Sequence, residues 1–162
     1  EFPDTKLRSP VRGDFPVSIL YDQIMMDHIK NARNYRGMEK ATNFAQGVNP
    51  LCGDEFKVFL NIQEKIIQDL SFQCECCGIS MASASMMTEM VKGKTEQEAH
   101  QTIASVQLSL KTGEQDSGLS DDLNAIFKTL VKFPSRINCA SLGWTTLDAA
   151  LRGKSNITLD GS

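Results

Sequence analysis

The strongest constraint on the fold is a pair of neighbouring segments in which apolar and polar residues alternate. Residues 55–62 place an apolar side chain at every second position, which is the period of a half-buried β-strand. A second such segment places Ile66, Leu70 and Phe72 on one face. The short polar link between the two segments suits a hairpin, and a third strand is predicted at residues 41–47.

Helical patterns flank the strands on both sides. Thr95 followed by Glu98 is the signature of a capping box, which marks the start of a helix. Because a run of strands precedes a run of helices, we predict an α+β fold in which an antiparallel sheet of about three strands packs against helices. The small residues at 81–85 should let another element approach their helix closely. The predicted helices cover approximately residues 17–34, 79–92, 95–110, 120–130 and 135–152.

The chain of 162 residues has the length of one domain with a substantial core. Residues 1–16 contain three prolines and mixed charges, and we predict a flexible N-terminal arm there. We expect a single domain at residues 17–153, followed by a flexible tail at residues 154–162.

Charge and hydropathy argue against several classes of protein. The net charge of −3 gives no basic field that would favour nucleic acid. The longest apolar stretches are far too short to span a bilayer, and the N-terminal residues contain no apolar run of the kind found in signal peptides. We therefore expect a cytoplasmic protein that binds neither nucleic acid nor membranes.

The pattern of the five cysteines argues against a framework of structural disulfides. Their number is odd, and three of them lie within four residues. Small secreted domains held by disulfides usually space their cysteines more widely. We expect reduced thiols that serve as metal ligands, nucleophiles or small buried hydrophobes. The cysteines are Cys52, Cys74, Cys76, Cys77 and Cys139.

The segment Asn49-Pro50-Leu51-Cys52-Gly53-Asp54 holds a thiol and a carboxylate two residues apart. Its Asn-Pro pair favours a turn, and the glycine lets the backbone bend so that both side chains can point the same way. A thiolate beside a carboxylate on a short turn is half of a tetrahedral metal site. Taken alone, however, the segment fits an ordinary loop with a buried Cys and a capping Asp better.

Two further cysteines have positions that suit the other half of such a site. Cys77 is expected at a strand end just before a helix, and Cys139 near the start of the last helix. Helix N-termini favour the thiolate form of cysteine. With Cys52 and Asp54, these residues would supply three sulfurs and one oxygen, which suits tetrahedral zinc or an iron–sulfur cluster. Spacing alone does not show that they converge, and three separate buried thiols are the alternative.

A specific set of motifs extends from about Ile19 to Leu151. They are Leu20-Tyr21, Asp27-His28, Asn49-Pro50 with Cys52-Gly53-Asp54, Cys77 leading into Ser80-Met81-Ala82-Ser83-Ala84-Ser85, Lys92-Gly93-Lys94, and Pro134 through Arg136 to Cys139. With these motifs the chain resembles the iron–sulfur cluster assembly proteins of the SufU/IscU type, also called NifU N-terminal-like. The SufU branch fits best, because the segment between Cys77 and Cys139 is long and Asn138 replaces the His of IscU-type proteins.

The resemblance implies a SufE/NifU-like fold and a zinc (Zn2+) site formed by Cys52, Asp54, Cys77 and Cys139. It also implies a SufS-like cysteine desulfurase as the partner, from which the protein accepts persulfide sulfur and passes it to downstream cluster assembly proteins. IscU-like relatives instead build a transient 2Fe–2S cluster on the same ligands, so a scaffold is the alternative function. Whether the protein is a zinc-dependent sulfurtransferase or a non-enzymatic scaffold stays open.

Within this resemblance, Cys52 is predicted to be the catalytic sulfur acceptor. It lies on a loop, where mobility is greatest, and shares that loop with Asp54, the weakest of the four ligands. A purely structural zinc domain is a further interpretation, but closed structural sites normally use Cys and His ligands rather than a carboxylate. A third interpretation is a globular domain that binds no metal.

Cys74 and Cys76 depart from the family pattern, since relatives commonly have glycine or other small residues there. Strand parity places both on the inner face with Phe72, and we interpret them as small buried residues. The alternative is that an extra thiol beside Cys77 competes for metal or relays sulfur. His28 could be a ligand, but a histidine on a semi-apolar helical stripe is more often structural.

Overall fold

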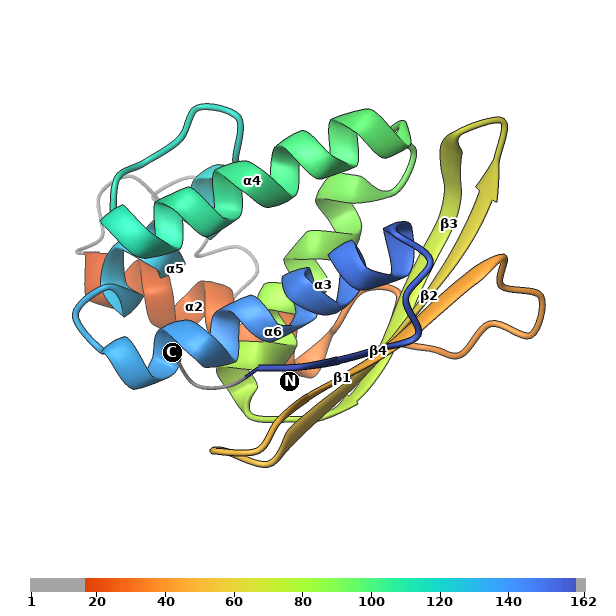
Figure 1. Cartoon of the computed structure of the whole chain (residues 1–162). Coiled ribbons are helices and arrows are strands. Elements are labelled where there is room, and N and C mark those ends of the chain that lie inside the picture. Colours follow the sequence, from red (N-terminus) through yellow and green to blue (C-terminus); the bar gives the residue numbers. More distant parts are fainter. Residues whose placement is uncertain (1–16, 160–162) are drawn as a thin grey trace.

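The computed structural model describes residues 17–159, so the predicted N-terminal arm lies outside the described part. The described helices cover one face of a β-sheet, and none of them lies on the other face (Figure 1). None of the described helices is long and apolar enough to cross a membrane. The elements are α2 (Val17–Lys30), β1 (Asn43–Asn49), β2 (Asp54–Gln63), β3 (Ile66–Glu75), α3 (Gly78–Val91), α4 (Glu96–Thr112), α5 (Asp121–Leu130), α6 (Pro134–Leu151) and β4 (Asn156–Thr158).

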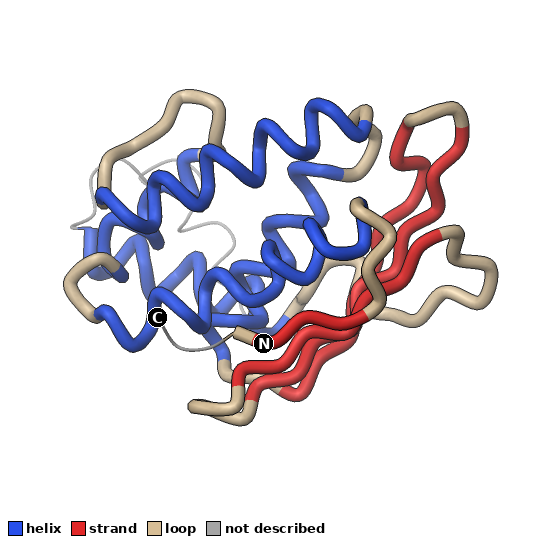
Figure 2. The backbone as a smooth tube through the Cα atoms, viewed as in Figure 1, coloured by secondary structure: helices blue, strands red, loops and turns tan. Residues whose placement is uncertain are grey.

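The sheet has the strand order β3-β2-β1-β4 (Figure 2). The antiparallel pairing of β1, β2 and β3 confirms the predicted three-stranded core of the sheet. The fourth strand was not predicted, because residues 154–162 were expected to form a tail. Residues 156–158 instead pair in parallel with β1, and Ile157 packs against the hydrophobic core. Three residues are too short for alternation to indicate a strand.

Alternation predicted the buried face of β2 correctly. Phe56, Val58 and Leu60 are fully buried. In β3, however, Ile67 rather than Ile66 enters the core. The pairing of β2 with β3 has an irregularity between Asn61 and Ile62, and such a shift reverses the side-chain parity beyond it.

The small residues of α3 allow α6 to approach closely, as the sequence suggested. A Cβ atom added to Gly143 of α6 would lie 3.3 Å from the Cβ atom of Ala84 and 3.4 Å from the ring of Phe56. The indole Nε1 of buried Trp144 donates to Ser83 Oγ at 3.1 Å. The Ser83 hydroxyl in turn donates to the carbonyl of Ala140 at 2.7 Å. These contacts hold α6 against α3 and the sheet.

The helix starts mostly follow the predicted signals. Thr95 and Glu98 form the complete capping box of α4, and the Ser120 side chain caps α5. The last helix begins at Pro134, a position that suits proline because the first helical N–H needs no partner within the helix.

Gly47 lies where β1 passes under α6, and a side chain there has no room. A Cβ atom would collide with the hydroxyl of Thr146, and it would lie 3.2 Å from a methyl carbon of Ile157. We expect Gly47→Ala to lower the free energy of unfolding by about 1–3 kcal/mol, measured by urea denaturation. Gly37→Ala is the control, because its Cβ would meet only the Gln73 side chain, at 3.7 Å or more. Equal stability of the two variants would contradict this packing.

Candidate functional site

The predicted turn joins β1 to β2 and carries the first two candidate ligands. Gly53 has φ of 79°, a left-handed conformation that favours glycine, and its N–H donates to the Asn49 carbonyl at 2.8 Å. Cys52 is exposed on this turn. Asp54 is the first residue of β2 and is 5% exposed. The turn therefore combines an accessible thiol with a buried carboxylate.

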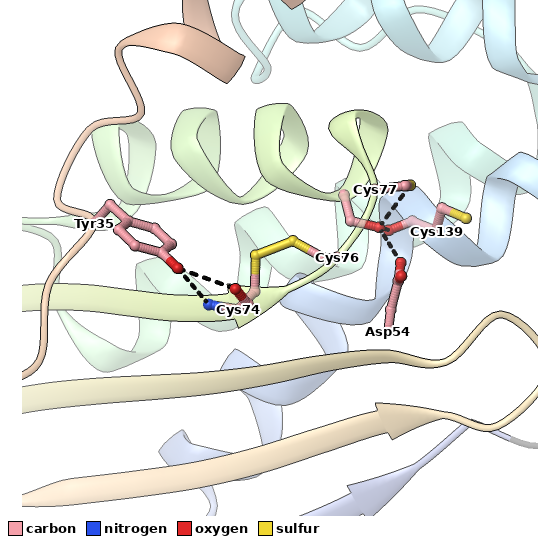
Figure 3. Close-up of a disulfide and its surroundings, with 7 residues drawn as sticks. Tyr35, Asp54, Cys74, Cys76, Cys77 and Cys139 are labelled. Atoms are coloured by element: carbon pink, nitrogen blue, oxygen red, sulfur yellow. Dashed lines mark hydrogen bonds between the residues drawn. A yellow bond between two sulfur atoms is a disulfide. The ribbon is translucent and has the colours of Figure 1, made fainter.

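Cys77 is the N-cap residue of α3, and its side chain makes no capping hydrogen bond. Its Sγ atom lies 3.4 Å from the hydroxyl oxygen of Ser80, one turn along the helix. Ser80 is buried, and its Oγ atom lies 2.6 Å from Asp54 Oδ2 and 2.9 Å from the backbone carbonyl oxygen of Cys139. Figure 3 shows Asp54, Cys77 and Cys139 beside one another, although each comes from a different part of the fold.

Ser80 is a site residue that the sequence analysis missed. It was recognised as part of a motif but was given no role. Ser80 follows Cys77 by three residues, which places both side chains on one face of the first turn of α3. This spacing is the feature of the sequence from which a role for Ser80 in the site could have been predicted. The Ser80 hydroxyl contacts Asp54 Oδ2 and so orients the carboxylate.

Cys139 lies in the second turn of α6 rather than at the helix start, and its residue is 6% exposed. Burial, and then the neighbouring Cys77, raise the pKa of the Cys139 thiol to about 12. The expectation that a helix N-terminus would favour its thiolate is therefore wrong, because desolvation opposes the charge. Binding to a metal ion would remove the proton.

The structure brings three of the four candidate ligands together, and Cys77 is not part of that group. The potential ligand atoms of Cys52, Asp54 and Cys139 all lie within 4.8 Å of one another. The Cys77 thiol borders this group, since its Sγ atom lies 3.4 Å from Ser80 Oγ, and Ser80 in turn contacts Asp54 and the Cys139 carbonyl. Three sulfurs and one carboxylate oxygen can hold a zinc ion or another thiophilic metal.

Comparison with known proteins gives the family of this site and fold. Residues 20–157 match the family described as NifU-like N terminal domain. The chain belongs to the NifU-like N-terminal domain family.

Two curated relatives and one solved structure are similar to this NifU-like domain. The zinc-dependent sulfurtransferase SufU of Bacillus subtilis is 38% identical over 130 residues, which cover 80% of this chain and 87% of the relative. The iron–sulfur cluster assembly scaffold protein IscU of Streptococcus pyogenes is 32% identical and covers 85% of this chain and 86% of the relative. The crystal structure of FiSufU from Fervidobacterium islandicum has a TM-score of 0.74 and 29% identity, covering 80% of this chain and 94% of that one. The SufU/IscU resemblance and the α+β fold are thus confirmed.

Cys74 and Cys76 of this NifU-like domain form a disulfide, so the expectation of five reduced thiols is wrong. Both residues are half-buried and pack against the hydrophobic core, as strand parity predicted. Because residues two apart on a strand share a face, their side chains can meet at the strand end. Their Cα atoms are 5.5 Å apart, within the usual range for a disulfide.

His28 does not belong to the group of candidate ligands, which agrees with its interpretation as a structural residue. Its Nδ1 atom lies 2.7 Å from Ser85 Oγ, and the side chain is almost fully buried. Burial, and then the positive charge of Arg33, lower the pKa of His28 to about 4. The imidazole is therefore neutral in the folded protein at neutral pH.

This lowered pKa predicts an acid-sensitive contribution to stability. Between about pH 6.5 and pH 4 the unfolded chain binds a proton on His28 that the folded chain does not, so the free energy of unfolding falls as the pH falls. The loss should reach up to about 3 kcal/mol. His28→Asn, whose amide can replace Nδ1 beside Ser85, should lose this part of the pH dependence. Urea denaturation of the metal-free wild type and of His28→Asn from pH 7 to pH 4 measures this difference. Parallel plots of unfolding free energy against pH for the two proteins would contradict the prediction.

Proposed function

We propose that this protein accepts persulfide sulfur from a cysteine desulfurase at a zinc site formed by Cys52, Asp54, Cys77 and Cys139, and passes the sulfur on for iron–sulfur cluster assembly. The observation that carries the proposal is the grouping of the Cys52, Asp54 and Cys139 ligand atoms within 4.8 Å, with the Cys77 thiol at its border. The relative named zinc-dependent sulfurtransferase SufU, at 38% identity, supports this choice.

The chemistry of the four side chains fits zinc. Zn2+ prefers four ligands drawn from Cys sulfur, His nitrogen and carboxylate oxygen. Asp54 is buried and contacts Ser80, while Cys77 is the N-cap residue of α3 and Cys139 lies on α6, and these two helices pack together. When bound, zinc would keep the thiols deprotonated and hold them together until a partner arrives.

Cys52 differs from the other two thiols in its access to a partner. It is exposed on a turn, whereas Cys77 is half-buried and Cys139 is buried. In the proposed step, the Cys52 thiolate attacks the outer sulfur of the persulfide on the desulfurase. The sulfur–sulfur bond of that persulfide breaks, the desulfurase cysteine leaves as a thiolate, and Cys52 then carries the persulfide.

The alternative function is a scaffold that assembles a 2Fe–2S cluster on the same ligands. It is supported by relatives named IscU scaffold proteins, such as that of Streptococcus pyogenes. The two functions differ in the first product. A sulfur acceptor gains a persulfide from the desulfurase without iron, whereas the scaffold function requires iron to be bound together with sulfide.

We expect about one zinc ion per chain. Its affinity should depend on Ser80, because residues that orient a metal ligand contribute about 10–100-fold to metal affinity. Ser80→Ala should weaken zinc binding by that factor in competition with a chromophoric chelator. Ser85→Ala is the matched control, since Ser85 is a buried serine of the same helix that bonds to His28 and to the Arg33 N–H instead. Equal zinc affinity in the two variants would contradict the role of Ser80.

Transfer of sulfur to Cys52 can be tested in the form that contains the Cys74–Cys76 disulfide. A desulfurase loaded with persulfide and freed of cysteine is mixed with the protein, and peptides are analysed by mass spectrometry. We expect one additional sulfur on Cys52 and none in Cys52→Ser. Additional sulfur on Cys139 or Cys77 with Cys52 unmodified would overturn the mechanism.

A further inference from the structure

The Cys74–Cys76 disulfide lies directly beside the candidate metal site. The last paired residues of the β2–β3 ladder include Phe56 with Cys74 and Glu55 with Glu75. Asp54 is the next residue of β2 and Cys76 the next residue after β3, so the two strand ends lie side by side. Figure 3 shows the disulfide on the same side of the sheet as Asp54, with Cys77 following it in the chain.

Cys74 is held in place by contacts of its backbone that do not involve the sulfur–sulfur bond. The Tyr35 hydroxyl donates to the Cys74 carbonyl at 3.0 Å and accepts from the Cys74 N–H at 3.3 Å. The pairing of Cys74 with Phe56 fixes the other edge of the same strand. Opening the disulfide therefore leaves the contacts that hold Cys74 in the strand in place. Both residues are only half-buried, so a reductant can reach them.

We infer that Cys74 and Cys76, as two free thiols, reduce the persulfide sulfur carried by Cys52 to sulfide, and that the disulfide is the product of this reaction. The inference rests on the proposed function, because it takes Cys52 as the sulfur acceptor. We assign the first attack to Cys76 because it follows Glu75, which pairs with Glu55 directly after Asp54. The ligand atoms of Asp54 and Cys52 lie within 4.8 Å of each other.

The reaction has two displacement steps. In the first, the Cys76 thiolate attacks the outer sulfur of the Cys52 persulfide, the bond to Cys52 breaks, and Cys52 leaves as a thiolate. In the second, the Cys74 thiolate attacks Sγ of Cys76 and expels the outer sulfur as hydrosulfide. One persulfide and two thiols thus give one thiol, one disulfide and one molecule of hydrogen sulfide.

This chemistry requires a pair of thiols outside the metal site. The two electrons that convert persulfide sulfur to sulfide come from oxidation of the pair, so Cys52, Cys77 and Cys139 stay available as ligands. The disulfide must be reduced again before the next turnover, and an external dithiol reductant serves this purpose by thiol–disulfide exchange.

The test compares the dithiol and disulfide forms of one sequence, so differences in folding cannot explain the result. The protein is reduced, freed of reductant by anaerobic gel filtration, and mixed with persulfide-loaded, cysteine-free desulfurase. Released sulfide is measured colorimetrically, and peptides are analysed by mass spectrometry. The reduced wild type should release about one sulfide per chain and regain the disulfide. The disulfide form should release at least about tenfold less sulfide and keep the sulfur on Cys52. Cys74→Ser should also release at least about tenfold less sulfide and keep the sulfur on Cys52 or Cys76.

The possible failures separate the two proposals. In one outcome, Cys52 carries the additional sulfur to the same extent in the disulfide and reduced forms, and the reduced form releases no more sulfide than the disulfide form. The inference is then overturned and the proposed function stands. Equal sulfide release from the reduced wild type and Cys74→Ser also overturns the inference. If Cys52 gains sulfur in neither form and no sulfide appears, the proposed function fails and the inference fails with it.

Discussion

The arrangement of the site depends on one buried hydrogen-bonding residue, Ser80. Its hydroxyl oxygen lies 2.6 Å from the Asp54 carboxylate at the start of β2 and 2.9 Å from the Cys139 carbonyl in α6. Ser80 belongs to α3, whose N-cap residue is Cys77. A hydrogen bond to a charged group contributes about 1.5–3 kcal/mol, and its loss in a buried position costs more than that of an exposed one. Through this residue the sheet and two helices hold their functional side chains in one place.

The packing of α6 on α3 makes this arrangement possible. Gly143 of α6 lies against Ala84 and Phe56, and larger residues at these positions would move α6 away from α3. Trp144 and Ser83 then fix the register of the two helices through the Ala140 carbonyl, next to Cys139. The position of the Cys139 thiol therefore follows from the hydrophobic core. The geometry of the candidate metal site therefore depends on the packing of the core.

The local elements could be predicted from the sequence, whereas the contacts between distant elements could not. Alternation, caps and the turn before Asp54 depend on residues close together in the chain, and these predictions were correct within a few residues. The approach of Cys139 to Cys52 depends on helix packing, which no local pattern encodes. For the same reason the sequence did not reveal the burial of Cys139, the role of Ser80 or the short strand β4. The disulfide was missed because an odd number of clustered cysteines indicates metal binding as readily as oxidation.

The central claim is that Cys52, Asp54, Cys77 and Cys139 bind one zinc ion, and X-ray absorption at the zinc edge tests it most directly. The account predicts a four-coordinate ion with three sulfur ligands at about 2.3 Å and one oxygen at about 2.0 Å. Asp54→Ala should lose the oxygen contribution while the sulfur contribution stays. Four sulfur ligands in the wild type would contradict the account, because Cys74 or Cys76 would then occupy the place assigned to Asp54. A spectrum dominated by oxygen and nitrogen would contradict the site itself.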